Sequence, residues 1–126
     1  MNPKRILIVD DHAELRRLVL LTLGPGYDIR EARDGREALD VCRQFAPDIV
    51  LLDVMMPGEL DGYQVCSAIR ADPELAATRV VLLTARGQQA DVAAGSAAGA
   101  DEYVVKPFSP LALMAMVEKM TGGGKP

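Results

Sequence analysis

Five short runs of β-branched and leucine residues recur along this 126-residue chain, and segments with helical spacing separate them. The runs are ILIVD at 6–10, the weaker YDIREA at 27–32, DIVLLD at 48–53, RVVLLTA at 79–85 and EYVV at 102–105. A strand that is buried on both faces reads as a continuous apolar run, and the first, third and fourth runs do. We therefore predict five β-then-α units, with a parallel sheet covered by helices on both faces.

Residues at the ends of the helical segments support this alternation. Asp34 and Glu37 have the spacing of a capping box at a helix start. Gly24 followed by Pro25 is expected to end the first helix, because proline cannot continue it. Ser109 is expected to cap the last helix, which carries apolar residues at the positions i, i+3, i+4 and i+7.

The length of the chain limits its number of domains, and the length of its apolar runs limits its contacts with membranes. At 126 residues it has room for one domain but not for two ordinary ones. We expect that domain to span residues 1–121, and the closing GGGKP at 122–126 to be a flexible tail. No apolar run is long enough to span a bilayer or to serve as a secretory signal, so we expect a cytoplasmic protein without membrane contact.

The net charge and the two cysteines indicate which kinds of partner and site the chain can have. The formal net charge is -4, and no stripe of Lys and Arg is available to displace counterions, so we expect no direct binding to nucleic acid. An acidic balance suits a site that holds a cation. Cys42 and Cys66 are isolated and fall on the apolar faces of expected helices, so we interpret both as reduced core residues.

Polar side chains follow four of the five expected strands. The first ends in Asp10 and Asp11, the third in Asp53, the fourth in Thr84 and the fifth in Lys106. In open α/β sheets, ligands bind outside the carboxyl ends of the strands. We therefore expect these side chains to meet at one edge of the sheet.

That set of side chains predicts phosphoryl transfer. Three carboxylates placed together repel one another, so they must bind protons or a cation, and Mg²⁺ suits a site of carboxylates, waters and a phosphate. Lys106 can pair with an oxygen of Asp53, and Thr84 adds a hydrogen-bond donor. A carboxylate held in this way can act as a nucleophile toward phosphorus, with the same groups stabilising the transition state.

These motifs together resemble those of a two-component response-regulator receiver domain of the chemotaxis-regulator type, over residues 4 to about 120. The matching pieces are the pair Asp10 and Asp11, LLDVMMPG with Asp53, LLTA with Thr84, and KPF with Lys106. The resemblance implies a (βα)5 flavodoxin-like, doubly wound fold with strand order 2-1-3-4-5.

The resemblance also implies the residues of a metal site. Asp11, Asp53 and the backbone carbonyl of Met55 would bind Mg²⁺, with Asp10 close by through a water. Asp53 would be the phosphoacceptor.

The same resemblance implies a signalling switch rather than an enzyme with a separate substrate. The phosphoryl group would come from a histidine kinase or a histidine phosphotransfer protein. Thr84 and Lys106 would then bind that group, and Tyr103 would change between outward and inward rotamers. The face formed by the fourth helix, the fifth strand and the fifth helix would contact a downstream protein target. The Lys106–Pro107 bond would be cis, as an X-Pro bond allows.

Two features depart from the usual pattern of the family, the loop after the third strand and the residues at positions 55 and 86. The sequence has three residues, Gly58 to Leu60, between Pro57 and Asp61, where two are usual. Met55 cannot orient a water and Arg86 could shield the site, so we expect slower autodephosphorylation than in a variant with Asn at position 55. The Ala- and Gly-rich segment 87–101 is expected to form the least protected helix.

Other interpretations stay open at this point. Asp11, with Glu14 three residues on, could simply cap a helix, and Tyr103 could be an ordinary half-buried strand residue. An aspartate-nucleophile phosphohydrolase would usually carry a second acid where Met55 stands. A flavodoxin-like cofactor binder would need a phosphate-cradling loop where the sequence is DDHAEL. A receiver-shaped interaction module that is never phosphorylated is the main alternative.

Overall fold

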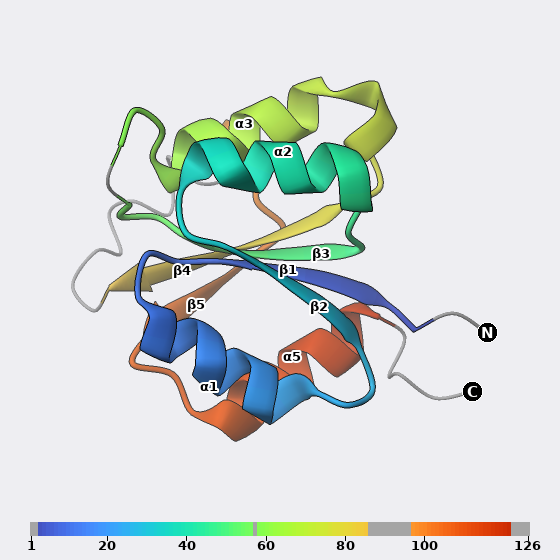
Figure 1. The fold of residues 1–126 in the computed structure, drawn as a ribbon, viewed down its shortest axis with the longest axis vertical. Coiled ribbons are helices and arrows are strands. Elements are labelled where there is room, and N and C mark those ends of the chain that lie inside the picture. The colour runs from blue at the N-terminus through green and yellow to red at the C-terminus, as the bar shows by residue number, and fades with distance from the viewer. Residues whose placement is uncertain (1–2, 57, 86–96, 122–126) are drawn as a thin grey trace.

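The computed structural model describes residues 3–56, 58–85 and 97–121 and contains the predicted parallel sheet (Figure 1). Its strands are β1 (Arg5–Val9), β2 (Asp28–Ala32), β3 (Ile49–Asp53), β4 (Arg79–Ala85) and β5 (Glu102–Lys106). They lie in the order β2-β1-β3-β4-β5, and every neighbouring pair is parallel. The flavodoxin-like order expected from the resemblance is therefore confirmed.

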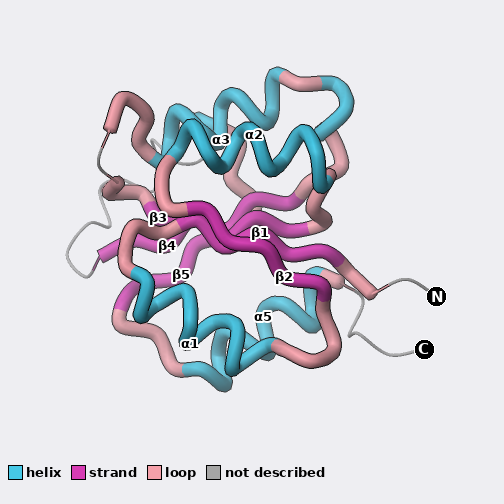
Figure 2. Tube along the Cα trace, viewed as in Figure 1, coloured by secondary structure: helices cyan, strands magenta, loops and turns pink. Residues whose placement is uncertain are grey.

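Helices cover both faces of this sheet. They are α1 (Ala13–Leu23), α2 (Gly35–Phe45), α3 (Gly62–Ala71) and α5 (Pro110–Met120), and a short 3-10 helix, η1 (Pro73–Leu75), follows α3. The helices α2 and α3 lie on one side of the sheet, and α1 and α5 lie on the other (Figures 1 and 2). Of the segment 87–101, in which a helix is expected, residues 87–96 lie outside the described residues, as does the expected tail at 122–126.

The local signals explain most helix boundaries. The Asp34 side chain accepts a hydrogen bond from the Glu37 backbone N–H, 2.9 Å away, at the start of α2. Ser109 caps α5 in the same way, accepting from Ala112, and α1 ends at Leu23 as Gly24 predicts. The prediction that Asp11 caps the first helix is wrong, because α1 begins one residue later than a cap at Asp11 requires.

The core forms two apolar layers, one on each face of the sheet. Along β1, Ile6 and Ile8 point into the layer under α1 and α5, whereas Leu7 and Val9 point into the layer under α2 and α3. All four side chains are fully buried, and each contributes roughly 1.5–3 kcal/mol of burial free energy. The alternation within an unbroken apolar run is what a strand covered on both faces requires.

Cys42 and Cys66 are both buried and unoxidised, as the sequence predicts. They belong to the layer under α2 and α3. Burial raises the pKa of the Cys42 thiol to about 11, so this side chain behaves as a small apolar residue. Within the described ranges, none of the helices has the length and apolar character that crossing a bilayer requires.

The start of α3 packs directly against the end of β3. The Gly62 backbone N–H donates to the Val54 carbonyl over 3.0 Å. A Cβ atom at Gly62 would lie 2.7 Å from the Val54 Cα and would also collide with the Asp53 carbonyl oxygen. Only a residue without a side chain allows this approach, which fixes the backbone on both sides of Asp53.

We expect Gly62→Ala to lower the free energy of unfolding by about 1–3 kcal/mol, because the added methyl group meets backbone atoms that cannot rotate away. Urea denaturation followed by circular dichroism measures this change. Gly26→Ala is the matched control, since no heavy atom lies within 4 Å of a Cβ built there. Equal stability of the two variants would show that the backbone at the β3–α3 junction shifts easily to make room for a methyl group.

Candidate functional site

The register of the sheet brings the polar strand ends together. Val9 lies beside Leu52 in the β1–β3 pairing, so the next residues, Asp10 and Asp53, are neighbours. Asp53 in turn lies beside Leu83, and Thr84 follows that residue on β4. On the far side of β4, Lys106 is paired with Ala85. Each strand thus delivers its side chain to the same carboxyl edge, as expected from the sequence.

Lys106 joins the two buried carboxylates of this edge. Its Nζ donates to Asp10 Oδ2 over 2.9 Å and forms an ion pair with Asp53 Oδ1 at 3.2 Å. Asp10 is fully buried and Asp53 is 3% exposed, whereas the Lys106 side chain keeps 23% of its surface in contact with solvent. The backbone N–H of Met55 also donates to Asp53 Oδ1, over 3.2 Å. Among the described residues, both of these contacts to Asp53 are made to the same oxygen, Oδ1.

Burial and charge perturb the ionisation of this cluster. Burial raises the pKa of Asp53, and the negative charge of Asp10 raises it further, while Lys106 partly offsets both effects. Burial by itself would lower the pKa of Lys106, but the hydrogen bond to Asp10 and the charge of Asp53 outweigh it, so that pKa is raised. Two carboxylates share one ammonium group, which leaves the cluster with an excess of negative charge.

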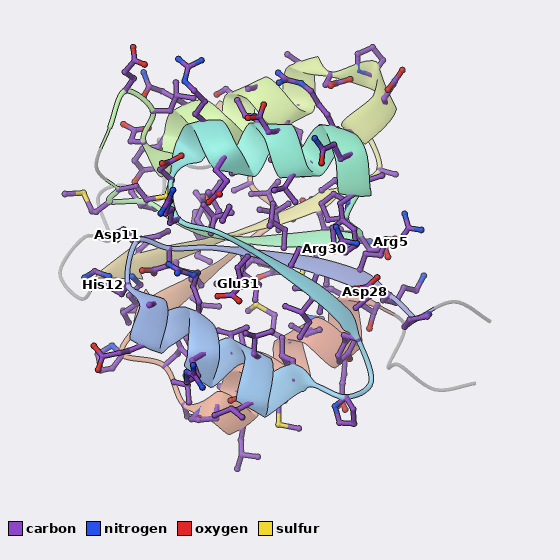
Figure 3. The ribbon with its side chains drawn as sticks, in the orientation of Figure 1. Arg5, Asp11, His12, Asp28, Arg30 and Glu31 are labelled. Atoms are coloured by element: carbon purple, nitrogen blue, oxygen red, sulfur yellow. The ribbon has the colours of Figure 1, made fainter. Side chains whose placement is uncertain are left out.

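Asp11 and His12 lie at the mouth of the site. Figure 3 shows both residues at the start of α1, at the end of the molecule opposite Arg5 and Asp28. The N-cap position of α1 belongs to His12, whose side chain makes no capping hydrogen bond. Asp11 precedes the cap, and its partly exposed carboxylate faces the His12 ring instead. The capping interpretation of Asp11 therefore fails, and its side chain remains available to the site.

The structure adds two residues to the site that the sequence did not assign to it. The His12 backbone N–H donates to Asp10 Oδ1 over 2.8 Å, and the His12 ring Nδ1 lies 2.9 Å from the same oxygen. This hydrogen bond to Asp10 and the charge of Asp11 raise the pKa of His12. Arg16 donates to the backbone carbonyl of Asp10 over 2.7 Å and to Glu31 on β2 over 2.9 Å. The only sequence signal for either residue was its nearness to the acidic pair.

The donor atoms fit a divalent cation. One atom each from Asp10, Asp11, His12 and Asp53 lies within 4.8 Å of all the others. Carboxylate oxygens are the ligands that Mg²⁺ takes from proteins, and the excess negative charge of the cluster calls for a cation. The Met55 side chain is 63% exposed, which fits its expected use through the backbone carbonyl rather than the side chain.

The expected switch residues lie close to this edge. Thr84 is 6% exposed, one residue beyond the neighbour of Asp53. Tyr103 is half-buried on β5 and packs against the apolar layer under α2 and α3. The Lys106–Pro107 peptide bond is cis, as expected. Arg86, the residue expected to shield the site, lies outside the described residues.

The longer loop after β3 leaves the start of α3 intact. Gly58 takes a positive φ of 99°, which glycine adopts without strain. Glu59 forms an ion pair with Arg36 of α2 at 3.0 Å. Asp61 and Gln64 then form a complete capping box at the start of α3. The capping box of α3 is therefore formed in full after this loop.

Comparisons with solved structures agree with this fold. The chemotaxis response regulator CheY4 of Vibrio cholerae has a TM-score of 0.87 and 32% identity, over 94% of this chain and 99% of that one. The response regulator DrrB of Thermotoga maritima has a TM-score of 0.85 and 32% identity, over 98% of this chain and 54% of that one.

Sequence comparisons give the family. Residues 6–118 match the response regulator receiver domain. The DNA-binding response regulator MtrA of Mycobacterium tuberculosis is 44% identical over 115 residues, which are 90% of this chain and 49% of MtrA. A ycf27 protein of Guillardia theta is 47% identical over 115 residues, covering 90% of this chain and 44% of that protein. The chain spans about half the length of these curated relatives. From its sequence and its fold, the chain belongs to the response regulator receiver domains of two-component systems.

Proposed function

We propose that the domain is a phosphorylation switch in which Asp53 accepts a phosphoryl group from a phosphohistidine of a histidine kinase or a phosphotransfer protein. One observation carries the proposal: Lys106 Nζ lies between Asp10 and Asp53 at the carboxyl edge of the sheet, 2.9 Å from one carboxylate and 3.2 Å from the other. A buried carboxylate with an ammonium group beside it suits in-line attack on phosphorus.

The reaction assigns separate roles to the two oxygens of Asp53. Lys106 and the Met55 N–H both contact Oδ1, so we assign Oδ2 as the nucleophile. As its bond to phosphorus forms, the P–N bond of the phosphohistidine breaks, and the imidazole leaves with the electron pair. Lys106 and the Thr84 hydroxyl then bind oxygens of the phosphoryl group and stabilise the charge that collects on them.

Asp11, Asp53 and the Met55 carbonyl are the residues that we propose to hold Mg²⁺, with Asp10 joining through water. The acidic donor set and its excess negative charge support this assignment. Bound there, Mg²⁺ would neutralise charge on the phosphoryl oxygens. The chain's own contribution is to place the carboxylates at a rigid strand end, so that the site needs little reorganisation when the ion and phosphate arrive.

The signal would pass from the site to the surface through β4 and β5. Thr84 and Lys106 lie on these adjacent strands, and Tyr103 lies on β5 three residues before Lys106. We propose that engagement of the phosphoryl group by Thr84 shifts the rotamer of Tyr103. The face that includes β5 and α5, together with the expected fourth helix, would then change its affinity for a protein target.

Further parts of the proposal concern the setting of this domain. We propose a domain over residues 1–121 that acts in the cytoplasm by protein contact and without a substrate other than its own Asp53. MtrA is named a DNA-binding response regulator, but this chain spans 49% of it, and its net charge of -4 favours a protein target for this domain. A receiver domain of DrrB with 32% identity and a TM-score of 0.85 was solved as activated by BeF3, which supports the same chemistry here.

Incubation with acetyl phosphate or a phosphohistidine donor and Mg²⁺ should add one phosphoryl group, measured by intact mass. Asp53→Asn should add none, because the amide oxygen is a poor nucleophile. Lys106→Met should slow the addition by roughly tenfold or more, since one group that stabilises transition-state charge is lost. Asp40→Asn, an exposed acid on α2, is the control and should behave as wild type. Unchanged phosphorylation of Asp53→Asn would disprove the assignment of the acceptor.

A second prediction concerns stability without metal. Because the pKa of Asp53 is raised above its ordinary value of 3.8, the ionised carboxylate destabilises the fold at any pH above the raised pKa. Asp53→Asn should therefore stabilise the protein in EDTA at pH 7.5 by about 0.5–2 kcal/mol. The gain should disappear as the pH falls through the raised pKa toward 3.8, where wild-type Asp53 is protonated.

Urea denaturation over a pH series measures this difference. Addition of Mg²⁺ should stabilise wild type by mass action and leave Asp53→Asn almost unchanged. If the variant is less stable than wild type in EDTA at pH 7.5, then the attraction between Lys106 and Asp53 exceeds the cost of burying the charge.

A third prediction concerns the lifetime of the phosphorylated state. The Met55 side chain is 63% exposed beside Asp53 and cannot orient a water. In the Met55→Asn variant, the aspartyl phosphate should hydrolyse at least about twofold faster than in wild type, because an amide side chain can position the attacking water. The decay of phosphorylated protein is followed by intact mass, with Met55→Leu as the apolar control. Equal decay in all three proteins would show that position 55 does not control access of water.

A further inference from the structure

The His12 ring lies against the carboxylates of the site, on the side away from Lys106. Its Nδ1 is 2.9 Å from Asp10 Oδ1 and 3.3 Å from Asp11 Oδ1. Lys106 contacts the other oxygen of Asp10, Oδ2, at 2.9 Å. The two nitrogen groups therefore lie on separate oxygens of one buried acid, and the ring does not compete with Lys106 for its position.

We propose that His12 is a further ligand of the divalent-ion site, through an imidazole nitrogen, and that this ligand gives the site a preference for transition ions such as Mn²⁺, Co²⁺ and Zn²⁺ over Mg²⁺. The inference rests on the proposed function, because it takes the acidic cluster as the metal site. It adds a nitrogen donor to a set of ligands otherwise made only of oxygens.

The spacing of the donor atoms fits one ion. An ion with bonds of about 2.1 Å places adjacent ligands about 3 Å apart and opposite ligands about 4.2 Å apart. The ring nitrogen and one oxygen of each of the three carboxylates lie within 4.8 Å of one another, so a shift of about 0.6 Å or less brings the widest pair to that spacing. The ring can make that shift, because the His12 side chain is 68% exposed and the capping position leaves it without a capping hydrogen bond.

The donor type sets the expected selectivity. Mg²⁺ is a hard ion that takes oxygen ligands and gives up water reluctantly. Imidazole suits the first-row transition ions, whose affinities for such sites rise from Mn²⁺ toward Cu²⁺. Loss of the ring should therefore weaken Co²⁺ binding strongly and Mg²⁺ binding only slightly. The ratio of the two affinities measures the contribution of the ring, separately from the overall charge of the site.

The composition of the chain makes a direct test possible, because His12 is its single histidine. The untagged protein is prepared with histidine labelled with ¹⁵N and loaded with Mn²⁺ at pH 8. Pulsed electron paramagnetic resonance should then detect a ¹⁵N coupling to the ion, which His12→Gln should lack. The label separates the imidazole from the amine of Lys106, which stays ¹⁴N.

Calorimetric titration supplies the second measurement. We expect His12→Gln to raise the Kd for Co²⁺ by about tenfold or more, and the Kd for Mg²⁺ by less than about twofold. Arg17→Gln is the matched control: it removes a positive charge from an exposed position of α1 without removing a ligand, and should leave the ratio of the two Kd values unchanged. Circular dichroism checks that the variants fold.

The outcomes separate this inference from the function on which it rests. Mn²⁺ binding without a ¹⁵N coupling, together with an unchanged ratio of Co²⁺ to Mg²⁺ affinity in His12→Gln, would overturn the role of His12. The proposed switch would survive that result if Asp53 is still phosphorylated with Mg²⁺. If neither wild type nor Asp11→Asn binds either ion at the edge of the sheet, the metal site does not exist there. Both proposals would then be wrong.

Discussion

The ammonium group of Lys106 between two buried carboxylates is the interaction on which the site depends. Asp10 and Asp53 are almost inaccessible to water, and two such anions on adjacent strands would oppose folding without a nearby cation. One ammonium group compensates only part of this charge; burial first, and then the charge of Asp10, keep the pKa of Asp53 raised. The protein thus folds with an uncompensated charge at the point where a metal ion and a phosphoryl group are proposed to bind.

The register of the parallel strands determines how close these side chains lie to one another. Four neighbouring strands, β1, β3, β4 and β5, carry the side chains of the proposed site, and pairings such as Val9 with Leu52 and Ala85 with Lys106 fix their relative heights. The apolar residues of β1, β3 and β4 that precede the site are buried on both faces, so these strands have little freedom to slide. The rigid core therefore holds the side chains of the site in fixed positions. The loops after the strands supply the more exposed side chains of the site.

Much of this arrangement could be predicted from the sequence, because apolar runs and the polar residues after them are local patterns. The meeting of the strand ends and the burial of both cysteines follow from such patterns, whereas the strand order was implied by the resemblance to receiver domains. The cap at Asp11 was predicted wrongly, since spacing alone cannot tell which residue of DDHAEL begins the helix. The contact of His12 with Asp10 depends on the path of the β1–α1 turn, which no periodicity encodes. The roles of the site residues stay predictions.

The position of each functional residue relative to the strands also governs which changes of chain length the domain can tolerate. The loop residues Gly58–Leu60 lie beyond Asp53 and before Asp61, whose capping box at the start of α3 is complete. A deletion within β1 would have a different effect: it would exchange the two core layers along that strand and carry Asp10 out of reach of Lys106. We therefore expect the domain to tolerate changes in the length of that loop better than changes in the length of the strands that end at the site.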